Sequence, residues 1–155
     1  MFYGKPWLTE PNEWKGYYHG IRCVAKRDLS SWSWSGYAEI SHTESNLFRD
    51  PEYARLQLNC HGGIKFWGWG KQQDVELDRC VGFRCNGSKD ICPKAIGTMI
   101  SDLLIQRGAT YKTLTFVKHE LEKLCYNINR IYEAEEGINL RNVDFKKSIG
   151  YNHGK

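Results

Sequence analysis

Hydrophobic and polar residues alternate in short runs through the first half of the chain and recur at helical spacing in the second half. Short alternating runs bounded by turn-forming residues are typical of strands in an antiparallel sheet. We expect about five strands, at residues 21–25, 34–40, 55–60, 64–67 and 80–85. A polar segment separates the first two runs, which predicts a hairpin with a long loop.

The alternation also predicts which side chains share a face, because successive side chains of a strand point to opposite sides of the sheet. In the third predicted strand Cys60 lies with two leucines, so His61 is expected on the other face. In the fifth strand Phe83 and Cys85 share the apolar face, and Arg84 between them points away from it. If these strands pair, His61 and Arg84 share one surface.

Two amphipathic helices are expected after the strands. Pro93 is typical of a first helical turn, and apolar residues continue from there until Gly108 ends the first helix. The second helix carries one continuous apolar stripe, made by Leu114, Val117, Leu121, Leu124, Ile128 and Ile131. Strands followed by helices predict an α+β fold, with the antiparallel sheet covered on one face by both helices.

Length and composition indicate one globular domain. The chain has 155 residues, of which 41% are hydrophobic, enough to bury a core without disulfides or a structural metal. We expect a single domain over residues 1–137, followed by a basic C-terminal tail at 138–155 whose docking stays open.

Charge and the apolar segments limit the classes of partner. The formal net charge is +4, and the basic residues are spread along the chain, so nucleic acid stays open as a partner without being favoured. The N-terminus lacks the apolar segment of a secretory signal, and no apolar run approaches the length that spans a bilayer. We therefore expect a cytoplasmic protein with no membrane partner.

Six cysteines in such a protein are expected to stay reduced. The candidates for a zinc site are Cys60, Cys80, Cys85 and Cys92. Pairs of zinc ligands usually lie two to four residues apart on a tight knuckle. Cys80 and Cys85 instead belong to one predicted strand, with four residues between them, and face opposite ways. Buried thiols that pack as small hydrophobes are the favoured interpretation, and we expect neither a metal nor a cofactor.

The segment His61-Gly62-Gly63 is the main candidate for a binding site. Gly62 and Gly63 allow backbone angles that other residues resist, so the chain can turn sharply or approach a ligand beside His61. Together with Arg84, these residues could form a patch suited to an anion. The alternative is a turn histidine and a surface arginine. His42 could act with His61 as a general base, or it could cap a turn.

Four tryptophans form two Trp-x-Trp pairs, Trp32 with Trp34 and Trp67 with Trp69. In a strand both members of a pair point to one side, so they could stack on bases or anchor a protein partner. Packing in the core is the plainer interpretation. No nucleophile elbow, phosphate-binding glycine loop or metal-binding histidine pair occurs, so a binding protein is favoured over an enzyme and the enzyme class stays open.

The motifs with distinctive residues are Gly20-Ile21-Arg22-Cys23, Trp34-Ser35-Gly36-Tyr37, His42, His61-Gly62-Gly63-Ile64, Gly82-Phe83-Arg84-Cys85 and the segment from Tyr111 to Leu121. Together they resemble a family of small, mostly uncharacterised bacteriophage proteins, which carries Gly-Phe-Asp-Cys-Ala-His-x-Gly-Asp after the His-Gly-Gly turn. Here Arg84 and Gly87 occupy the Asp and His positions, and only Asp90 matches the closing acid. This departure removes a His and Asp set and predicts an anion-seeking patch in its place.

The resemblance implies an accessory protein, in the host cytoplasm if phage-encoded, that binds and inhibits or sequesters a host factor. A defence component is the expected target. A CRISPR-type nuclease complex would be bound through the tryptophans, and an anionic nucleotide signal through His61 and Arg84. Two alternatives stay open: a nucleotide or phosphodiester hydrolase that uses His42 and His61, and a nucleic-acid-binding module.

Overall fold

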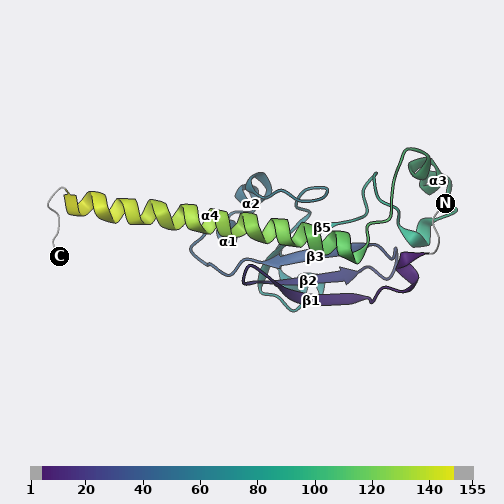
Figure 1. Ribbon diagram of the computed structural model, residues 1–155, viewed down its shortest axis with the longest axis horizontal. Helices are drawn as coiled ribbons and strands as arrows, with labels where there is room; N and C mark the ends of the chain where they lie inside the picture. The colour runs from purple at the N-terminus through teal and green to yellow at the C-terminus, as the bar shows by residue number, and fades with distance from the viewer. Residues whose placement is uncertain (1–4, 149–155) are drawn as a thin grey trace.

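The computed structural model describes residues 5–148, with side chains described through residue 138. A five-stranded antiparallel sheet in the order β1-β2-β3-β5-β4 forms its centre (Figure 1). The strands are β1 (Glu13–Tyr18), β2 (Ile21–Arg27), β3 (Trp34–Glu39), β4 (Phe66–Trp69) and β5 (Arg79–Arg84). The α+β class with an antiparallel sheet is therefore confirmed.

Short helices connect the strands, and one long helix ends the described part of the chain. The α-helices are α1 (Asn46–Arg49), α2 (Pro51–Gln57), α3 (Met99–Gln106) and α4 (Leu114–Ser148). Single 3-10 turns lie at Pro6–Leu8, Gly70–Gln73 and Pro93–Ala95. Within residues 5–148, no helix combines the length and apolar character needed to cross a bilayer.

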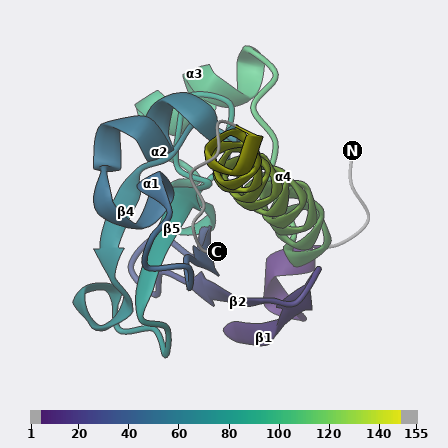
Figure 2. The same ribbon diagram turned by 90° about the vertical axis from the view of Figure 1, so that its left-hand side faces the viewer.

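Helix α4 covers one face of the sheet, as its apolar stripe predicted (Figure 2). Its stripe residues Val117, Leu121 and Leu124 are completely buried in the main core. The helix lies close to the sheet at Gly36 in β3, where a Cβ atom would lie 2.6 Å from the Phe83 ring and 3.2 Å from Val117. The absence of a side chain at this position lets the helix and the Phe83 ring pack directly over the strand.

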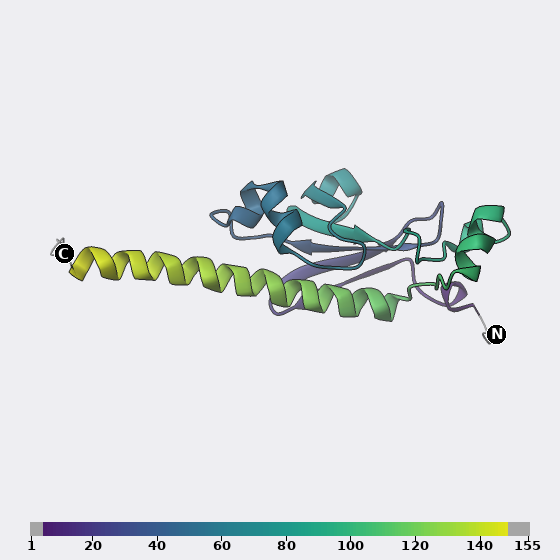
Figure 3. The same cartoon turned by 90° about the horizontal axis from the view of Figure 1, so that it is seen from above.

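The same helix extends well past the sheet (Figure 3). It continues without interruption through Gly137, where the sequence predicted the end of the domain and the start of a separate tail. The backbone of that predicted tail is thus helical up to Ser148. Residues 149–155, and the side chains from residue 139 onward, lie outside the described residues.

Helix α3 does not join α4 on the sheet. It starts at Met99 after the cap Thr98, several residues later than Pro93 predicted, and it lies beyond the end of the sheet (Figure 1). Met99 is 87% exposed and Ile100 is 73% exposed. Of the two helices expected to cover the sheet, only α4 does so.

The prediction of a third strand at residues 55–60 is wrong. Asp50 caps a helix there by accepting hydrogen bonds from backbone N–H groups, Pro51 occupies its first turn, and the chain forms α2. Leu56 is 80% exposed, whereas Leu58 is buried. The fifth strand is instead β1, which the sequence did not predict, and the return strand predicted at 64–67 lies two residues later, in β4.

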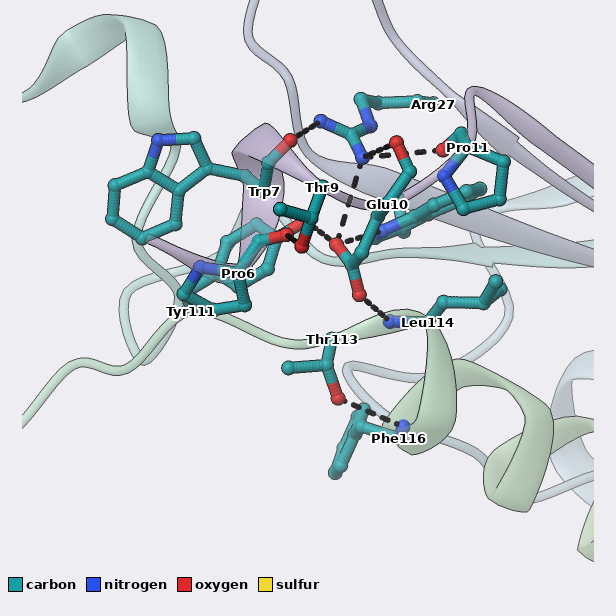
Figure 4. A network of polar contacts seen from close by, with 11 residues as sticks. Pro6, Trp7, Thr9, Glu10, Pro11, Arg27, Tyr111, Thr113, Leu114 and Phe116 are labelled. Carbon is teal, nitrogen blue, oxygen red and sulfur yellow. Dashed lines mark hydrogen bonds and ion pairs between the residues drawn. The ribbon is translucent and has the colours of Figure 1, made fainter. Parts of the chain in front are cut away.

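A network around Glu10 fixes the start of α4 against the sheet (Figure 4). The Glu10 carboxylate accepts hydrogen bonds from the Leu114 backbone N–H at 2.7 Å, from the Trp34 indole at 3.1 Å and from the Tyr111 hydroxyl. Arg27 lies 3.6 Å from the same carboxylate. Burial and the bond to Glu10 raise the pKa of Tyr111, so the phenol stays a donor. A carboxylate at a helix N-terminus also complements the helix dipole.

Candidate functional site

The His-Gly-Gly segment forms a tight turn after α2. Gly62 and Gly63 adopt φ angles of 71° and 79°, in the left-handed region that favours glycine, as the sequence predicted. The Gly63 backbone N–H donates to the Cys60 carbonyl at 2.9 Å, which closes the turn. The His61 backbone N–H donates to the buried Glu120 carboxylate of α4 at 2.9 Å, so the turn is attached to the long helix.

The His61 ring is held on two sides. Its Nε2 lies 2.8 Å and 2.9 Å from the two carboxylate oxygens of Asp90, and its ring packs edge-on against Phe116 of α4 with centroids 5.1 Å apart. A neutral imidazole in this position carries its proton on Nε2 and donates it to Asp90. Nδ1 is then the nitrogen that keeps a lone pair for a proton or a ligand.

Asp90 is a buried carboxylate with a full set of donors. Besides His61, it accepts hydrogen bonds from the Gly87 backbone N–H at 2.9 Å and contacts Lys112 Nζ at 3.0 Å. The sequence predicted that the departure at Arg84 and Gly87 removes a His and Asp set. Those two motif positions carry neither an acid nor a histidine, and the structure forms a different pair, in which Asp90, the one acid that matches the motif, contacts His61 across 29 residues of sequence.

A pocket of about 390 Å³ opens beside this pair. Its lining comes from the His61 turn, the end of β5 and the loop that leads to Asp90. The lining residues are His61, Gly62, Lys65, Arg84, Asn86, Gly87, Ser88, Lys89 and Asp90. This volume lies within the range of small-molecule sites.

Arg84 lies where strand alternation placed it. Phe83 and Cys85 on either side are in the main core, whereas the exposed Arg84 lies on the opposite face of β5 and donates from Nη2 to Gln73 Oε1 at 3.0 Å. His61 and Arg84 therefore line one pocket, as proposed from the sequence. The predicted reason was different, because His61 belongs to a turn and not to a strand paired with β5.

A second pocket of about 200 Å³ adjoins the first and shares Arg84 and Asn86 with it. Its remaining lining residues come from β2, the loop after it, β3 and the β4–β5 connection: Lys26, Arg27, Asp28, Ser33, Ser35, Tyr37 and Gln73. Arg84 therefore lines both hollows.

His42 is not part of this site. Its ring stacks on Tyr132 with centroids 3.6 Å apart, whereas His61 packs on Phe116 of the same helix. At 1.5 Å per residue, these two positions on α4 are about 24 Å apart. The two histidines considered as a catalytic pair therefore do not meet.

The tryptophans serve the core more than the surface. Trp34 is completely buried, and Trp32 lies outside β3 with a φ of 63°. In β4, the Trp67 indole donates to a backbone carbonyl of α1 at 2.9 Å, and Trp69 is 41% exposed. The Arg79 guanidinium lies 3.9 Å from the Trp67 ring centroid and 4.2 Å from that of Trp69. Both β4 tryptophans thus point to one side, as predicted, but around an internal arginine.

The cysteines do not gather at one point. Cys85 lies in the main core and Cys60 packs against it, whereas Cys80 belongs to a smaller cluster on the other face of the sheet, and Cys92 is half-buried. Burial raises the pKa of Cys60 and of Cys80 to about 12. Across the described residues, no three His, Cys, Asp or Glu side chains are placed to hold one metal ion.

Three charged residues of the site were missed by sequence reasoning. Lys65 and Lys89 line the pocket, and Lys112 holds Asp90 from the segment that precedes α4. Lys89 and Lys112 fall inside the phage-like motif segments, but nothing in the sequence distinguished any of the three from an ordinary surface lysine. Only Asp90 had a signal, its place at the end of the phage-like motif.

Searches against family models, curated proteins and solved structures find no match for this chain. The resemblance to bacteriophage proteins therefore rests on the residue motifs and stays a prediction.

Proposed function

We propose that this protein is a phage-type accessory binding protein that sequesters an anionic, phosphate-bearing small molecule of the host in the His61 pocket. The observation that carries this proposal is the charge of the pocket. Lys65, Arg84 and Lys89 line it, and within the described residues none of the three is paired with a carboxylate. The one carboxylate of the lining, Asp90, is already matched by Lys112 and His61.

The chemistry of the three cations suits phosphate. Guanidinium groups bind phosphate through two parallel hydrogen bonds, and ammonium groups add charge without a fixed geometry. Exposed Gly62 and Gly87 leave room for a ligand close to the backbone of both loops. Because the cations are exposed, their attraction for an anion is screened by salt. Affinity is therefore expected to fall as ionic strength rises.

Inhibition of a host nuclease complex, the other target class, has less support. It needed the tryptophans as anchors at a protein interface, and Trp34 is buried while the Trp67 indole is occupied by a backbone carbonyl. Trp69 is the one member of the set that is exposed. A protein interface concentrates its binding energy in a central cluster of residues, and a single exposed tryptophan at the edge of a sheet does not form such a cluster.

Titration calorimetry with adenosine monophosphate as the probe tests the proposal. We expect saturable binding at about 50 mM salt that weakens several-fold at about 300 mM, and a loss of about three- to tenfold in affinity for Lys89→Met. Lys15→Met is the matched control. Lys15 lies on β1, whose axis is three strand spacings, about 14 Å, from that of β5, so loss of its charge should leave affinity unchanged.

The proposal fails if the protein binds neither adenosine monophosphate nor any phosphate-bearing metabolite after exposure to host lysate, as read by native mass spectrometry. Recovery of a stoichiometric complex with a host protein, without a small molecule, would favour the nuclease-inhibitor class instead. Binding of oligonucleotides in preference to mononucleotides would favour the nucleic-acid module.

The contact of His61 with Asp90 supports a second candidate, hydrolysis of a phosphate ester in the same pocket. In such a reaction water attacks phosphorus, the ester oxygen leaves, and His61 Nδ1 takes the proton from water and returns it to the leaving oxygen. Turnover of a nitrophenyl phosphodiester, abolished in His61→Ala but retained in His42→Ala, would support it. A His61→Ala variant that stays folded and hydrolyses at the wild-type rate would exclude it.

A further inference from the structure

The two adjoining pockets differ in charge, although they share Arg84 and Asn86. In the His61 pocket, none of the described carboxylates pairs with Lys65 or Lys89. In the second pocket the cations are already used: Lys26 contacts the Asp74 carbonyl at 2.8 Å and its carboxylate at 3.0 Å, and the buried Arg27 donates to the Trp7 carbonyl at 2.6 Å. Phosphate is therefore favoured in the first pocket and not in the second.

The second pocket instead offers neutral hydrogen-bonding groups and one carboxylate. Ser33, Ser35, Tyr37 and Gln73 contribute hydroxyl and amide groups to its lining. Asp28 adds a carboxylate whose Oδ1 accepts from the Ser30 hydroxyl at 2.7 Å, which holds the pKa of Asp28 below its usual range. These bonds leave Oδ2 of Asp28 as an acceptor for a ligand hydroxyl.

Arg84 is fixed at the boundary between the two hollows. Its partner Gln73 Oε1 also accepts a hydrogen bond from the Tyr37 hydroxyl at 3.2 Å, so both side chains are oriented by one amide oxygen. Arginine carries five N–H donors, and the bond to Gln73 leaves donors available on the guanidinium. A ligand that reaches both pockets must pass beside this group.

We propose that the ligand of this site is a phosphate ester of a sugar-like, hydroxyl-rich group, with its phosphate in the His61 pocket and its hydroxyls in the neighbouring pocket across Arg84. This inference rests on the proposed function and names the class of ligand. The phosphate contacts Lys65, Lys89 and Arg84, and the hydroxyls donate to Asp28 and exchange hydrogen bonds with Ser35. Both a free sugar phosphate and a nucleotide carry this chemistry.

Calorimetry with orthophosphate and ribose 5-phosphate separates the two parts of the site. We expect ribose 5-phosphate to bind about tenfold or more tightly than orthophosphate, because several hydroxyl contacts are added to the same phosphate contacts. Ser35→Ala should weaken ribose 5-phosphate by about fivefold and leave orthophosphate unchanged. Asp28→Asn also removes a negative charge near Arg84, so it should weaken ribose 5-phosphate relative to orthophosphate without weakening orthophosphate itself. Lys89→Met should weaken both probes by a similar factor.

Orthophosphate and ribose 5-phosphate binding with equal affinity, both sensitive to Lys89→Met, would overturn the inference while the phosphate pocket stands. Failure of both probes, of adenosine monophosphate and of every phosphate-bearing metabolite from the lysate to bind would overturn the proposed function itself. The thermal unfolding midpoint of each variant verifies folding, and Asp28→Asn keeps an oxygen acceptor for Ser30. Adenosine monophosphate then distinguishes the source: tighter binding than ribose 5-phosphate supports a nucleotide, and weaker binding supports a free sugar phosphate.

Discussion

Helices α3 and α4 both carry apolar residues at helical spacing, yet α4 buries most of its apolar stripe and α3 exposes most of its apolar residues. Leu121 of α4 is completely buried, whereas Met99, Ile100 and Leu103 of α3 are exposed. The two helices differ in what surrounds them. Beneath α4 lies a face of the sheet with Gly36 and small side chains, which lets a long helix approach closely. An apolar stripe thus shows that a helix can pack, and the surface opposite it decides whether it does.

The attachment of the two helices differs as well. The first turn of α4 is bonded to Glu10, and thereby to Arg27 and the N-terminal segment. Helix α3 lies between Gly97 and Gly108, both at positive φ, and the segment after it rejoins the fold through an isolated bridge between Asp90 and Thr110. A helix of eight residues with few tertiary contacts is only marginally stable by itself.

The largest expected effect is loss of packing under α4. Leu121→Ala removes a completely buried side chain and leaves a cavity between the helix and the sheet, so the free energy of unfolding should fall by about 2–5 kcal/mol. Urea denaturation followed by circular dichroism measures it. A loss below about 1 kcal/mol would mean that α4 is not docked as described.

Removing the attachment of α4 should cost less. Glu10→Gln replaces the charged acceptor of Leu114, Trp34 and Tyr111 by a neutral amide and removes the ion pair with Arg27, so we expect a loss of about 1–3 kcal/mol. Glu13→Gln, at a more exposed glutamate on β1, is the control and should be nearly neutral. Equal unfolding midpoints for the two variants would remove the assigned role of Glu10.

The buried thiol of Cys125, on the face of α4 that packs on the sheet, should make the contact between α4 and the sheet sensitive to alkaline pH. The hydrogen bond with Cys23, 3.3 Å away, and burial both raise the pKa of Cys125 above that of an unfolded thiol. The folded state therefore keeps the proton, and the stability it adds is present below about pH 8.5 and is lost as pH rises.

Unfolding free energies at several pH values from 7 to 10 test this dependence. Wild type should lose more stability with rising pH than Cys125→Ala, with a difference of up to about 1.4 kcal/mol per pH unit above the unfolded pKa. The comparison with the variant cancels the contribution of the buried thiols that do not contact Cys125. Parallel curves for the two proteins would contradict the expected shift at Cys125.

The smallest effect is expected at α3. Leu103→Ala makes the same chemical change as Leu121→Ala, but in an exposed side chain, and should alter the free energy of unfolding by about 0.5 kcal/mol or less. The same urea titration measures both. A loss near that of Leu121→Ala would show that α3 packs on a surface in solution, and the contrast between the helices would disappear.

Local sequence patterns predicted several elements and part of the site. The alternation around Phe83 correctly separated Cys85 from Arg84, because a regular strand fixes the direction of each side chain. The same method failed at residues 55–60. The Asp50 cap and Pro51 favoured a helix there, and their effect outweighed the short alternating pattern. Strand β1 was missed because it lacks a clear apolar alternation. One of its faces is exposed, and its aromatic residues stand among charged residues and a glycine.

The candidate site likewise has one part that the sequence predicted and another that it did not. The turn at Gly62 and Gly63 was predictable, since two consecutive glycines favour positive φ. The pairing of His61 with Asp90 was not, because it depends on where two loops meet after the sheet and α4 have packed. For the same reason no local signal marked Lys65 and Lys89 as neighbours of Arg84.

The sequence by itself determined the α+β class, the apolar stripe of α4, the glycine turn at His61 and the side of β5 to which Arg84 points. These features depend on residues close together in the chain, where backbone geometry and side-chain period act directly. Tertiary structure alone decided that α3 stays exposed, that His42 and His61 lie apart, and that Asp90 holds His61 beside three cations. Such contacts join distant segments, and only the packed core brings them within reach of one another.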